Sequence, residues 1–403
     1  MRNRYRGEPA QSRWSDSMIQ ISRYTLPIAA IALLAMYPVH AVDSHDPDEA
    51  RPRVGLVLSG GGARGAAHVG VLKVLEEMRV RVDYVAGTSM GAIVGGLYAS
   101  GMSPGEIEDV FSEYNWAKVF KNDIDREDIS FRRKQDDNIF GVRAKPGFDL
   151  REAELKLPSA FLEGQKANMI LHELTLPVAE IDDFDRFPVP FRAVATDIGT
   201  GQTAVLGSGK LAAALRASMA VPGGLAPEII DGRILVDGGV SNNLPIDVAR
   251  AMGADIVIVV DISTPLMDAE EITDVLSITE QLTNIMTRAN TEVQLRTLQP
   301  GDITILPELG DIATTDFNRV LEAVPLGYAA ADGARAQLGA LSLPREEFDG
   351  WLAGRDLADP SPPVVDFIRI ENNSGLEEDA LLARVKHPVG VPLDEGELGR
   401  DIN

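Results

Sequence analysis

From residue 54 onward, short apolar runs alternate with segments that carry apolar residues at helical spacing. A short apolar run bounded by turn residues is typical of a buried strand, and the longer periodic segments between the runs are typical of helices. Alternation of this kind predicts a largely parallel sheet covered by helices, which is an α/β fold. The apolar runs lie at residues 54–58, 82–86, 191–196, 256–260 and 303–306.

Two glycine-containing turns each follow an apolar run and precede a helical pattern. The first reads Ser-Gly-Gly-Gly-Ala-Arg-Gly at residues 59–65, and the second reads Gly-Thr-Ser-Met-Gly at residues 87–91. Gly-x-Ser-x-Gly at a strand-to-helix junction is typical of a nucleophile elbow, in which the glycines allow a sharp turn that exposes the serine hydroxyl. Ser89 is therefore the candidate nucleophile.

The first turn could supply the oxyanion hole that such a nucleophile needs. Consecutive glycines at the start of a helix leave unpaired backbone N–H groups facing one concave space, where the helix dipole favours negative charge. Gly60, Gly61 and Gly62 are the candidate donors, and loss of one such donor typically costs about 3 kcal/mol of transition-state stabilisation. Arg64 could contact an oxyanion or a phosphate, or it could brace the loop.

The same loop also matches the Gly-x-Gly-x-x-Gly pattern of dinucleotide-binding proteins. That pattern places an acidic residue about twenty positions further on, at the end of the next strand. Asp83 lies instead at the start of the next apolar run, and the turn with Ser89 occupies its end. A cofactor site is therefore the weaker interpretation, and the hydrolase interpretation requires neither a cofactor nor a metal.

Histidine is not an obvious general base in this chain. Of the five histidines, only His172 and His387 follow Ser89, as the Ser-acid-His order of α/β-hydrolases requires. His172 lies in a helical pattern without a turn signal, and His387 lies in a separate C-terminal segment. His68 is interpreted as a structural residue of the helix that follows the glycine loop.

An aspartate is a better candidate for the base. Asp237 directly follows the apolar run 234–236 and precedes Gly238 and Gly239. An aspartate at a strand end, followed by glycines that allow close approach of the backbone, could reach the serine hydroxyl and accept its proton. By itself, however, Asp-Gly-Gly is most often a turn.

Taken together, these motifs resemble the patatin-like phospholipases. The resemblance rests on residues 60–65, 87–91 and 237–239, extends to Ala-Ser-Met-Ala-Val-Pro at residues 217–222, and covers roughly residues 53–341. It implies a three-layer α/β/α fold with a largely parallel central sheet. It also implies a catalytic dyad of Ser89 and Asp237 without histidine, with the oxyanion held by the amides of residues 60–62. The supporting residues that it implies are Arg64, Gly87, Gly91, Gly238 and Gly239.

Composition narrows the range of partners. The formal net charge of -23 makes nucleic acid an improbable partner, because no surface-wide positive field would attract phosphates. The absence of cysteine excludes disulfides and thiolate metal sites.

The N-terminus predicts export. Arginines precede an apolar run at residues 26–36, and Val-His-Ala at residues 39–41 provides a small-residue cleavage pattern. The run is too short to span a bilayer, so residues 1–41 are interpreted as a secretory signal, with an uncleaved anchor as the alternative. Residues 42–52 form a polar linker. The expected location is the periplasm, the outer membrane or the cell surface.

The remaining chain divides into a catalytic domain at residues 53–345, a linker at 346–363 and a tail at 364–403. Within the domain, the basic segment Phe-Arg-Arg-Lys at residues 131–134, together with Arg143 and Lys145, could form a solvated loop or a flap that meets lipid head groups. Apolar residues recur at helical spacing at residues 276–298 and predict a packing helix rather than a membrane helix. The tail resembles the first half of a POTRA domain, an incomplete α+β segment, which implies an outer-membrane barrel in a longer protein.

The sequence as a whole favours an exported lipid acyl hydrolase that cleaves carboxyl esters of phospholipids or lysophospholipids at a membrane surface. Two alternatives remain open. One is a general esterase or thioesterase that acts on soluble acyl substrates through the same residues. The other is a non-catalytic passenger of a secretion system.

Overall fold

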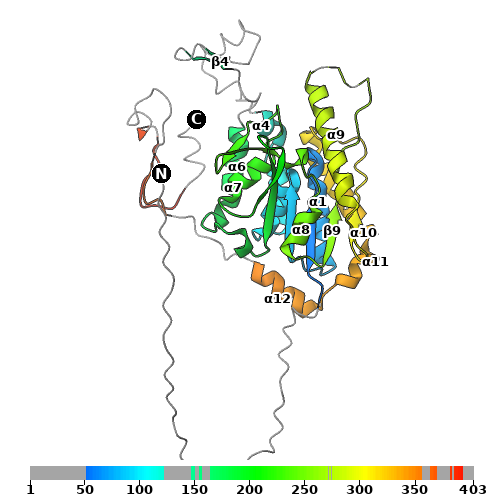
Figure 1. Cartoon of the computed structure of the whole chain (residues 1–403). Helices are drawn as coiled ribbons and strands as arrows, with labels where there is room; N and C mark the ends of the chain where they lie inside the picture. The colour runs from blue at the N-terminus through cyan, green and yellow to red at the C-terminus, as the bar shows by residue number, and fades with distance from the viewer. Residues whose placement is uncertain are drawn as a thin grey trace, which may run out of the picture. The chain divides into compact units, whose positions relative to one another are not determined.

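A computed structural model describes residues 51–121, 147–149, 154–156, 164–270, 272–273, 275–355, 364–369, 382–383 and 385–393. Within these residues eight strands form one sheet, in the order β10-β9-β1-β2-β5-β8-β7, with β6 paired to β5 (Figure 1). The strands are β1 (Val54–Leu58), β2 (Tyr84–Thr88), β5 (Phe191–Asp197), β6 (Gln202–Leu206), β7 (Glu228–Ile230), β8 (Arg233–Asp237), β9 (Ile256–Val260) and β10 (Ile303–Ile305). A separate hairpin joins β3 (Gly147–Asp149) and β4 (Glu154–Lys156).

The α/β fold is as predicted, but the sheet is mixed rather than largely parallel. Strands β10, β9, β1, β2 and β5 pair in parallel. By contrast, β8 and β6 pair antiparallel with β5, and β7 pairs antiparallel with β8. The apolar run 234–236 predicted β8 but not its direction, whereas β6 and β7 were not predicted, because a short strand at the margin of a sheet has one polar, half-exposed face.

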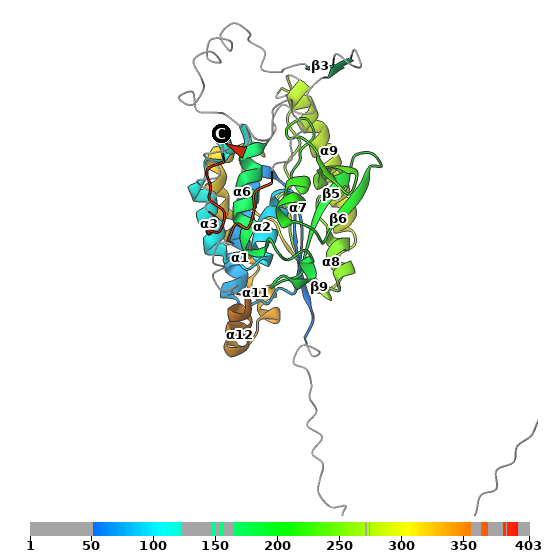
Figure 2. The same cartoon turned by 90° about the vertical axis from the view of Figure 1, so that its left-hand side faces the viewer.

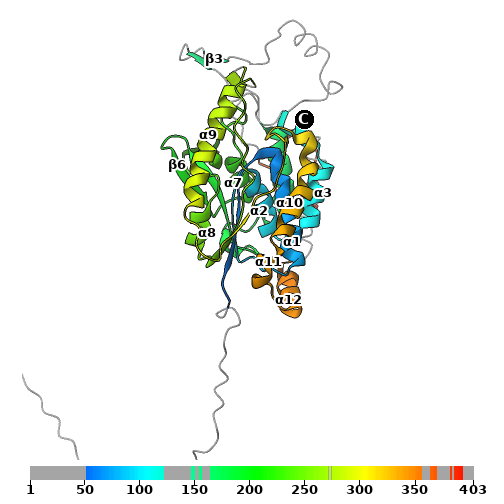
Figure 3. The same ribbon diagram turned by 90° about the vertical axis from the view of Figure 1, so that its right-hand side faces the viewer.

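Helices cover both faces of the sheet. The helices are α1 (Ala67–Glu77), α2 (Met90–Ala99), α3 (Pro104–Glu113), α4 (Trp116–Lys121), α6 (Gln165–Thr175), α7 (Leu211–Ser218), α8 (Ile246–Met252), α9 (Val275–Leu295), α10 (Ala323–Gly333), α11 (Arg335–Leu338) and α12 (Arg345–Arg355). Figure 3 shows the strands nearly edge-on, with α8 and α9 on one side and α1, α3 and α10 on the other.

The alternation of side chains along the strands explains this division into layers. Leu56 and Leu58 of β1 belong to a large apolar cluster shared with α1, α2, α3, α7 and α10. Val57, between them, belongs to a second cluster shared with α8. Because successive residues of a strand point to opposite faces, one strand contributes to both cores.

Two strands meet end to end along β5. Thr88 at the end of β2 pairs with Val194, and Asp237 at the end of β8 pairs with Ala195, the next residue of β5. Strand β6 occupies the other edge of β5 over residues 193–197, so β2 and β8 must share one edge. Because β2 runs parallel and β8 antiparallel to β5, their carboxyl ends face each other at this point.

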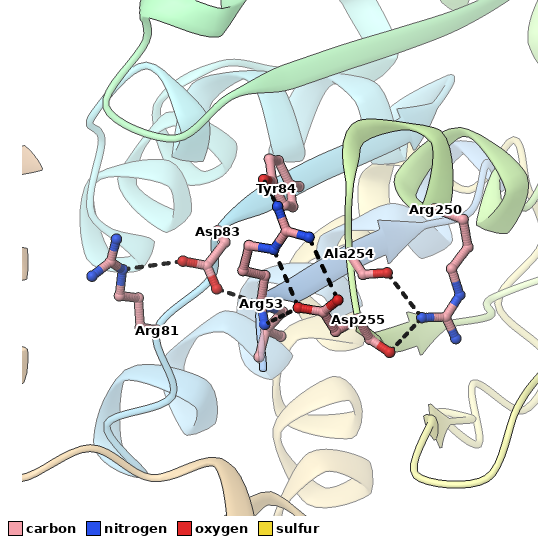
Figure 4. Close-up of polar contacts among 8 residues, drawn as sticks. Arg53, Arg81, Asp83, Tyr84, Arg250, Ala254 and Asp255 are labelled. Carbon is pink, nitrogen blue, oxygen red and sulfur yellow. Dashed lines mark hydrogen bonds and ion pairs between the residues drawn. The ribbon is translucent and has the colours of Figure 1, made fainter. Parts of the chain in front are cut away.

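The amino ends of the parallel strands are joined by polar contacts, which lie at the opposite end of the sheet (Figure 4). The backbone N–H and the guanidinium of Arg53 donate to Asp255, at 2.9 and 3.2 Å from Oδ2. The backbone N–H of Val54 donates to Oδ2 of Asp83 at 2.7 Å, and Arg81 pairs with the same carboxylate. These contacts connect the segments preceding β1, β2 and β9 and fix the register of the central strands.

The folded unit extends beyond the predicted boundary at residue 345. Residues 345–355, most of which were predicted as linker, form α12, which lies at the amino end of β1 near α11 (Figure 2). Its Arg355 is buried, donates to Glu76 Oε1 and to the Tyr98 carbonyl at 2.9 Å each, and lies over the Tyr98 ring. The segment is polar on average, which concealed its docking, but buried Phe348 and the half-buried Trp351 attach it to the core together with Arg355.

Several predictions concern residues outside the described ranges. The secretory signal at 1–41, nearly all of the linker at 42–52 and the basic segment at 131–134 are among them. Of the predicted POTRA-like tail, the structure describes only parts, including a bridge between Val364 and Pro392. Among the described residues, no helix combines the length and the apolar character needed to cross a membrane.

Candidate active site

Ser89 lies at the turn between β2 and α2, with its backbone in an unusual conformation. Its φ is 54° and its ψ is -124°. Residues other than glycine rarely adopt a positive φ. Its backbone N–H donates to Ser218 Oγ at 2.8 Å, and Ser218 Oγ donates to the Val194 carbonyl at 2.6 Å. The surrounding hydrogen bonds thus hold the strained turn in place, as is typical of functional residues.

The two glycines of the Gly-x-Ser-x-Gly turn are required by close backbone approach. A Cβ on Gly87 would lie 2.4 Å from the Gly91 carbonyl oxygen, and a Cβ on Gly91 would lie 2.4 Å from the Leu58 carbonyl oxygen. Helix α2 can therefore begin directly against the end of β1 only because neither position has a side chain. The sequence prediction of a tight strand-to-helix turn rests on this same requirement.

Asp237 is the hydrogen-bond partner of the Ser89 hydroxyl. Ser89 Oγ donates to Asp237 Oδ2 at 2.6 Å, and the backbone N–H of Gly239 donates to Asp237 Oδ1 at 2.7 Å. Both side chains are buried, with exposed fractions of 8% for Ser89 and 5% for Asp237. The end-to-end meeting of β2 and β8 along β5 brings the two residues together, although 148 positions separate them in the sequence.

Burial raises the pKa of Asp237 to about 6, while the hydrogen bonds from Ser89 and Gly239 act in the opposite direction. A carboxylate in a dry site is a stronger base than one in water, and a pKa near the working pH suits a group that accepts and returns a proton. Asp237 is thus ionised at neutral pH and is already hydrogen-bonded to the proton that it would take.

The glycine loop lies directly beside the serine. A Cβ on Gly60 would lie 2.9 Å from Ser89 Cβ, so only glycine allows this approach. The N–H of Gly60 donates to the Asn243 side chain at 3.2 Å. Among the described residues, no hydrogen-bond acceptor faces the N–H groups of Gly61 and Gly62. Within this part of the chain, the N–H groups of Gly61 and Gly62 are therefore unpaired, Gly61 lines the pocket over Ser89, and the N–H of Gly60 is held by Asn243.

Arg64 braces the loop. Its guanidinium is buried and donates to the carbonyl oxygens of Ile262 and Ile312 at 3.0 and 2.8 Å, and to that of Ser263 at 3.4 Å. These contacts attach the start of η2 (Gly62–Ala66) to the segments that follow β9 and β10. Of the two roles considered for Arg64, the geometry supports the structural one.

Among the described residues, the hydroxyl of Ser89 donates to Asp237 and not to a histidine. His68 is fully buried in α1, and its Nε2 lies 2.9 Å from the Ser59 carbonyl oxygen, to which the neutral ring donates. Burial lowers the pKa of His68 to about 4, so the ring is uncharged. His172 is exposed on α6, and the Nδ1 of His387 lies 3.0 Å from the Pro388 carbonyl oxygen.

A pocket opens over Ser89 and Asp237. Within the described part of the chain, its lining includes no histidine, and three of its residues come from α9. The lining residues are Gly60, Gly61, Ser89, Val221, Asp237, Gly239, Asn243, Thr264, Thr283, Asn284 and Thr287.

Three contributions to the pocket were not predicted from the sequence. These are the hydrogen bond between Ser218 and the Ser89 amide, the hydrogen bond between Asn243 and the Gly60 amide, and the polar face of α9. A signal for α9 was present, since Asn284, Thr287 and Thr291 recur at helical spacing opposite the apolar residues.

Comparison with known proteins identifies the domain that holds this site. Residues 56–250 match the family model for patatin-like phospholipases. An uncharacterized NTE family protein of Mycobacterium tuberculosis is 34% identical over 223 residues, which are 54% of this chain and 52% of that protein. Human patatin-like phospholipase domain-containing protein 6 is 35% identical over 213 residues, 52% of this chain and 13% of that protein.

Lysophospholipase nte1 of Emericella nidulans is 30% identical over 332 residues, which are 76% of this chain and 20% of that protein. The chain thus spans about half the length of the mycobacterial relative and a fifth or less of the other two. The matched segment contains Ser89, Asp237 and the glycine loop. Residues 56–250 therefore belong to the patatin-like phospholipase family.

Proposed function

We propose that this protein is a lipid acyl hydrolase that cleaves carboxyl esters of phospholipids or lysophospholipids through Ser89 and Asp237. The observation that carries the proposal is the 2.6 Å hydrogen bond from Ser89 Oγ to Asp237 Oδ2 in a buried site beside two free backbone amides. This arrangement combines a nucleophile, a base and an oxyanion site, which are the requirements of acyl transfer.

In the first half-reaction, Ser89 Oγ attacks the ester carbonyl carbon while its proton passes to Asp237 Oδ2. The carbonyl oxygen becomes an oxyanion that accepts hydrogen bonds from the amides of Gly61 and Gly62. When the tetrahedral intermediate collapses, the bond to the alcohol oxygen breaks, and protonated Asp237 gives its proton to that oxygen. The products are the free alcohol and an acyl ester on Ser89.

In the second half-reaction, water attacks the acyl carbonyl and Asp237 accepts its proton. Collapse of this intermediate releases the fatty acid, and the proton returns to Ser89 Oγ. No separate base is required, because one carboxylate performs both proton transfers. The hydrogen bond from the Gly239 N–H to Oδ1 leaves Oδ2 aimed at the serine throughout the cycle.

The test combines product analysis with two variants of the proposed catalytic residues and one control variant. The full-length protein is incubated with a phosphatidylcholine that carries a different acyl chain at each position, and mass spectrometry identifies the released acid and lysolipid. Ser89→Ala and Asp237→Asn are expected to abolish release, whereas His172→Ala, a change on the exposed face of α6, should leave it within a few-fold of the unaltered protein. Turnover of p-nitrophenyl butyrate without release from phosphatidylcholine would indicate a general esterase instead.

We also propose export, on the basis of the signal-like residues 1–41. Fusion of these residues to a reporter that is active only outside the cytoplasm tests it directly. An inactive fusion, with a functional signal as the positive control, would remove this part of the proposal.

A further inference from the structure

Helix α9 presents its polar face to the protein and its apolar face to solvent. An ordinary surface helix shows the opposite arrangement. On the inward face, Asn284 and Thr291 are buried. On the outward face, five apolar side chains, the α9 stripe, are each exposed by 41% or more: Ile278, Leu282, Ile285, Met286 and Val293. The helix predicted at residues 276–298 therefore forms, but most of the apolar residues expected to pack it do not pack.

Hydrogen bonds beside Asp237 fix this orientation. Thr287 Oγ1 and Asn290 Nδ2 donate to the Gly239 carbonyl at 3.2 and 2.8 Å. The backbone N–H of Asn243 donates to Asn290 Oδ1 at 2.8 Å. Rotation of α9 to bury its apolar side would break these contacts and open the pocket. The exposed stripe is therefore a consequence of how the active site is built.

The α9 stripe forms one continuous band. At 100° per residue, its five side chains fall within an arc of about 100° on the helix. No charged residue occurs from 281 to 287, the part of the helix nearest the pocket. Arg288 and Glu292 form an ion pair further along the helix. A long apolar band with a polar border is typical of helices that lie in the plane of a lipid interface.

We propose that the α9 stripe docks the protein on the surface of a zwitterionic lipid aggregate, with the helix lying in the interface. This inference rests on the proposed function, because it gives the hydrolase access to aggregated substrate. The net charge of -23 opposes attraction to anionic membranes, so attachment must rely on burial of apolar side chains.

The α9 stripe lies close to the catalytic pocket. Thr283 and Thr287 line the pocket over Ser89, while the α9 stripe occupies the other side of the same helix. A helix with its side chains is about 10–12 Å across. Amphipathic helices insert about 5–10 Å into the boundary between head groups and acyl chains, which is also the depth of the ester bonds. Docking therefore brings the pocket within about one helix width of the bond to be cleaved.

Site-specific fluorescence tests the docking. The chain contains no cysteine, so a single introduced cysteine can carry one environment-sensitive dye. Leu282→Cys and Ile285→Cys are labelled in the full-length protein, and Ile229→Cys, an apolar position exposed by 69% on β7, is the matched control. Dioleoylphosphatidylcholine vesicles should shift the emission at 282 and 285 to the blue and reduce iodide quenching at least about threefold there, with no change at 229.

Each dye reports only its own position, so attachment of vesicles elsewhere on the chain does not reproduce this pattern. Unchanged emission at 282 and 285, or an equal change at 229, overturns the proposal. Protection of 282 before vesicles are added, together with dimeric elution on a sizing column, also overturns it, because a second copy then covers the stripe.

Activity provides a second readout. Leu282→Ser combined with Ile285→Ser should reduce hydrolysis of phosphatidylcholine vesicles at least about tenfold through weaker apolar attachment, while turnover of soluble p-nitrophenyl butyrate stays unchanged. Ile229→Ser with Ile234→Ser is the matched control and should change neither rate. If the unaltered protein cleaves only the soluble ester, the lipid hydrolase proposal fails, while the dye experiment still decides the docking.

Discussion

Replacement of the buried Asp237 by asparagine, its neutral isostere, should abolish activity and stabilise the fold. Asp237→Asn preserves the size of the side chain, and its amide can still accept from the Gly239 N–H while contacting Ser89 Oγ. Without a group that can take the serine proton, hydrolysis stops. The substitution also removes a negative charge from a site that is almost fully buried, so the free energy of unfolding should increase.

The size of this cost follows from the pKa of Asp237. Burial raises this pKa to about 6 from its ordinary value of 3.8, and the difference corresponds to about 3 kcal/mol. Above pH 6 the side chain is ionised in both states, so the folded state bears the full cost. As the pH falls from 6 to 4, the folded state binds the proton first and the unfolded state follows, so the cost disappears.

Urea unfolding at pH 8 and pH 4 measures this difference. Asp237→Asn should be more stable than the unaltered protein by up to about 3 kcal/mol at pH 8 and nearly equal to it at pH 4. Asp197→Asn, a half-exposed carboxylate at the end of β5, is a control whose effect should be small. Equal stability of Asp237→Asn and the unaltered protein at pH 8 would refute the claim that burial dominates at Asp237, as would a gain that persists at pH 4.

Four further outcomes are expected. Turnover of p-nitrophenyl butyrate should fall in one step with a midpoint near pH 6 as Asp237 becomes protonated, and a pH-independent rate between 5 and 8 would contradict this assignment. Asn243→Ala should lower kcat/KM at least about tenfold, because the Gly60 amide loses its side-chain acceptor and keeps only the backbone carbonyl of residue 243 at 3.4 Å, so the oxyanion loop is less firmly held, while a fluorophosphonate probe still labels Ser89. Arg355→Met should destabilise the fold by about 3–5 kcal/mol in urea, because Glu76 is left without its cation, and Glu76→Gln in the same chain should recover part of the loss. Deletion of residues 364–403 should leave the melting temperature and esterase activity nearly unchanged, whereas deletion from 345 onward, which removes α12, should lower the melting temperature.

The central strands and the turn at Ser89 were predictable because their signals are local. A buried strand requires a short apolar run, and the turn requires glycines where backbones approach closely. The run 54–58 matches β1, and the glycines at 87 and 91 are explained by backbone contacts within the turn and with β1. Such requirements act within a few residues, so the sequence records them directly.

Tertiary structure decided the placement of distant residues. The sequence put Asp237 at a strand end, but only the reversal of β8 along β5 brings its carboxylate to Ser89. Likewise, the sequence identified the amides of the glycine loop as candidate oxyanion donors. Only the structure shows that the Gly60 N–H already donates to Asn243. Pairings over such distances depend on the whole sheet, and no local pattern encodes them.

Helix α9 and helix α12 show the same division between local and tertiary information. Periodicity predicted a helix with one apolar face at residues 276–298, and α9 (Val275–Leu295) forms over most of that range. Periodicity does not specify which face the rest of the protein covers, and here the hydrogen bonds around Gly239 placed the polar face inward. In α12, the buried side chains of Phe348 and Arg355 attach a helix whose composition resembles a linker. The sequence by itself determined the local conformations and the chemical groups, and the tertiary structure decided which groups meet, because burial and hydrogen bonding between distant segments exist only in the folded chain.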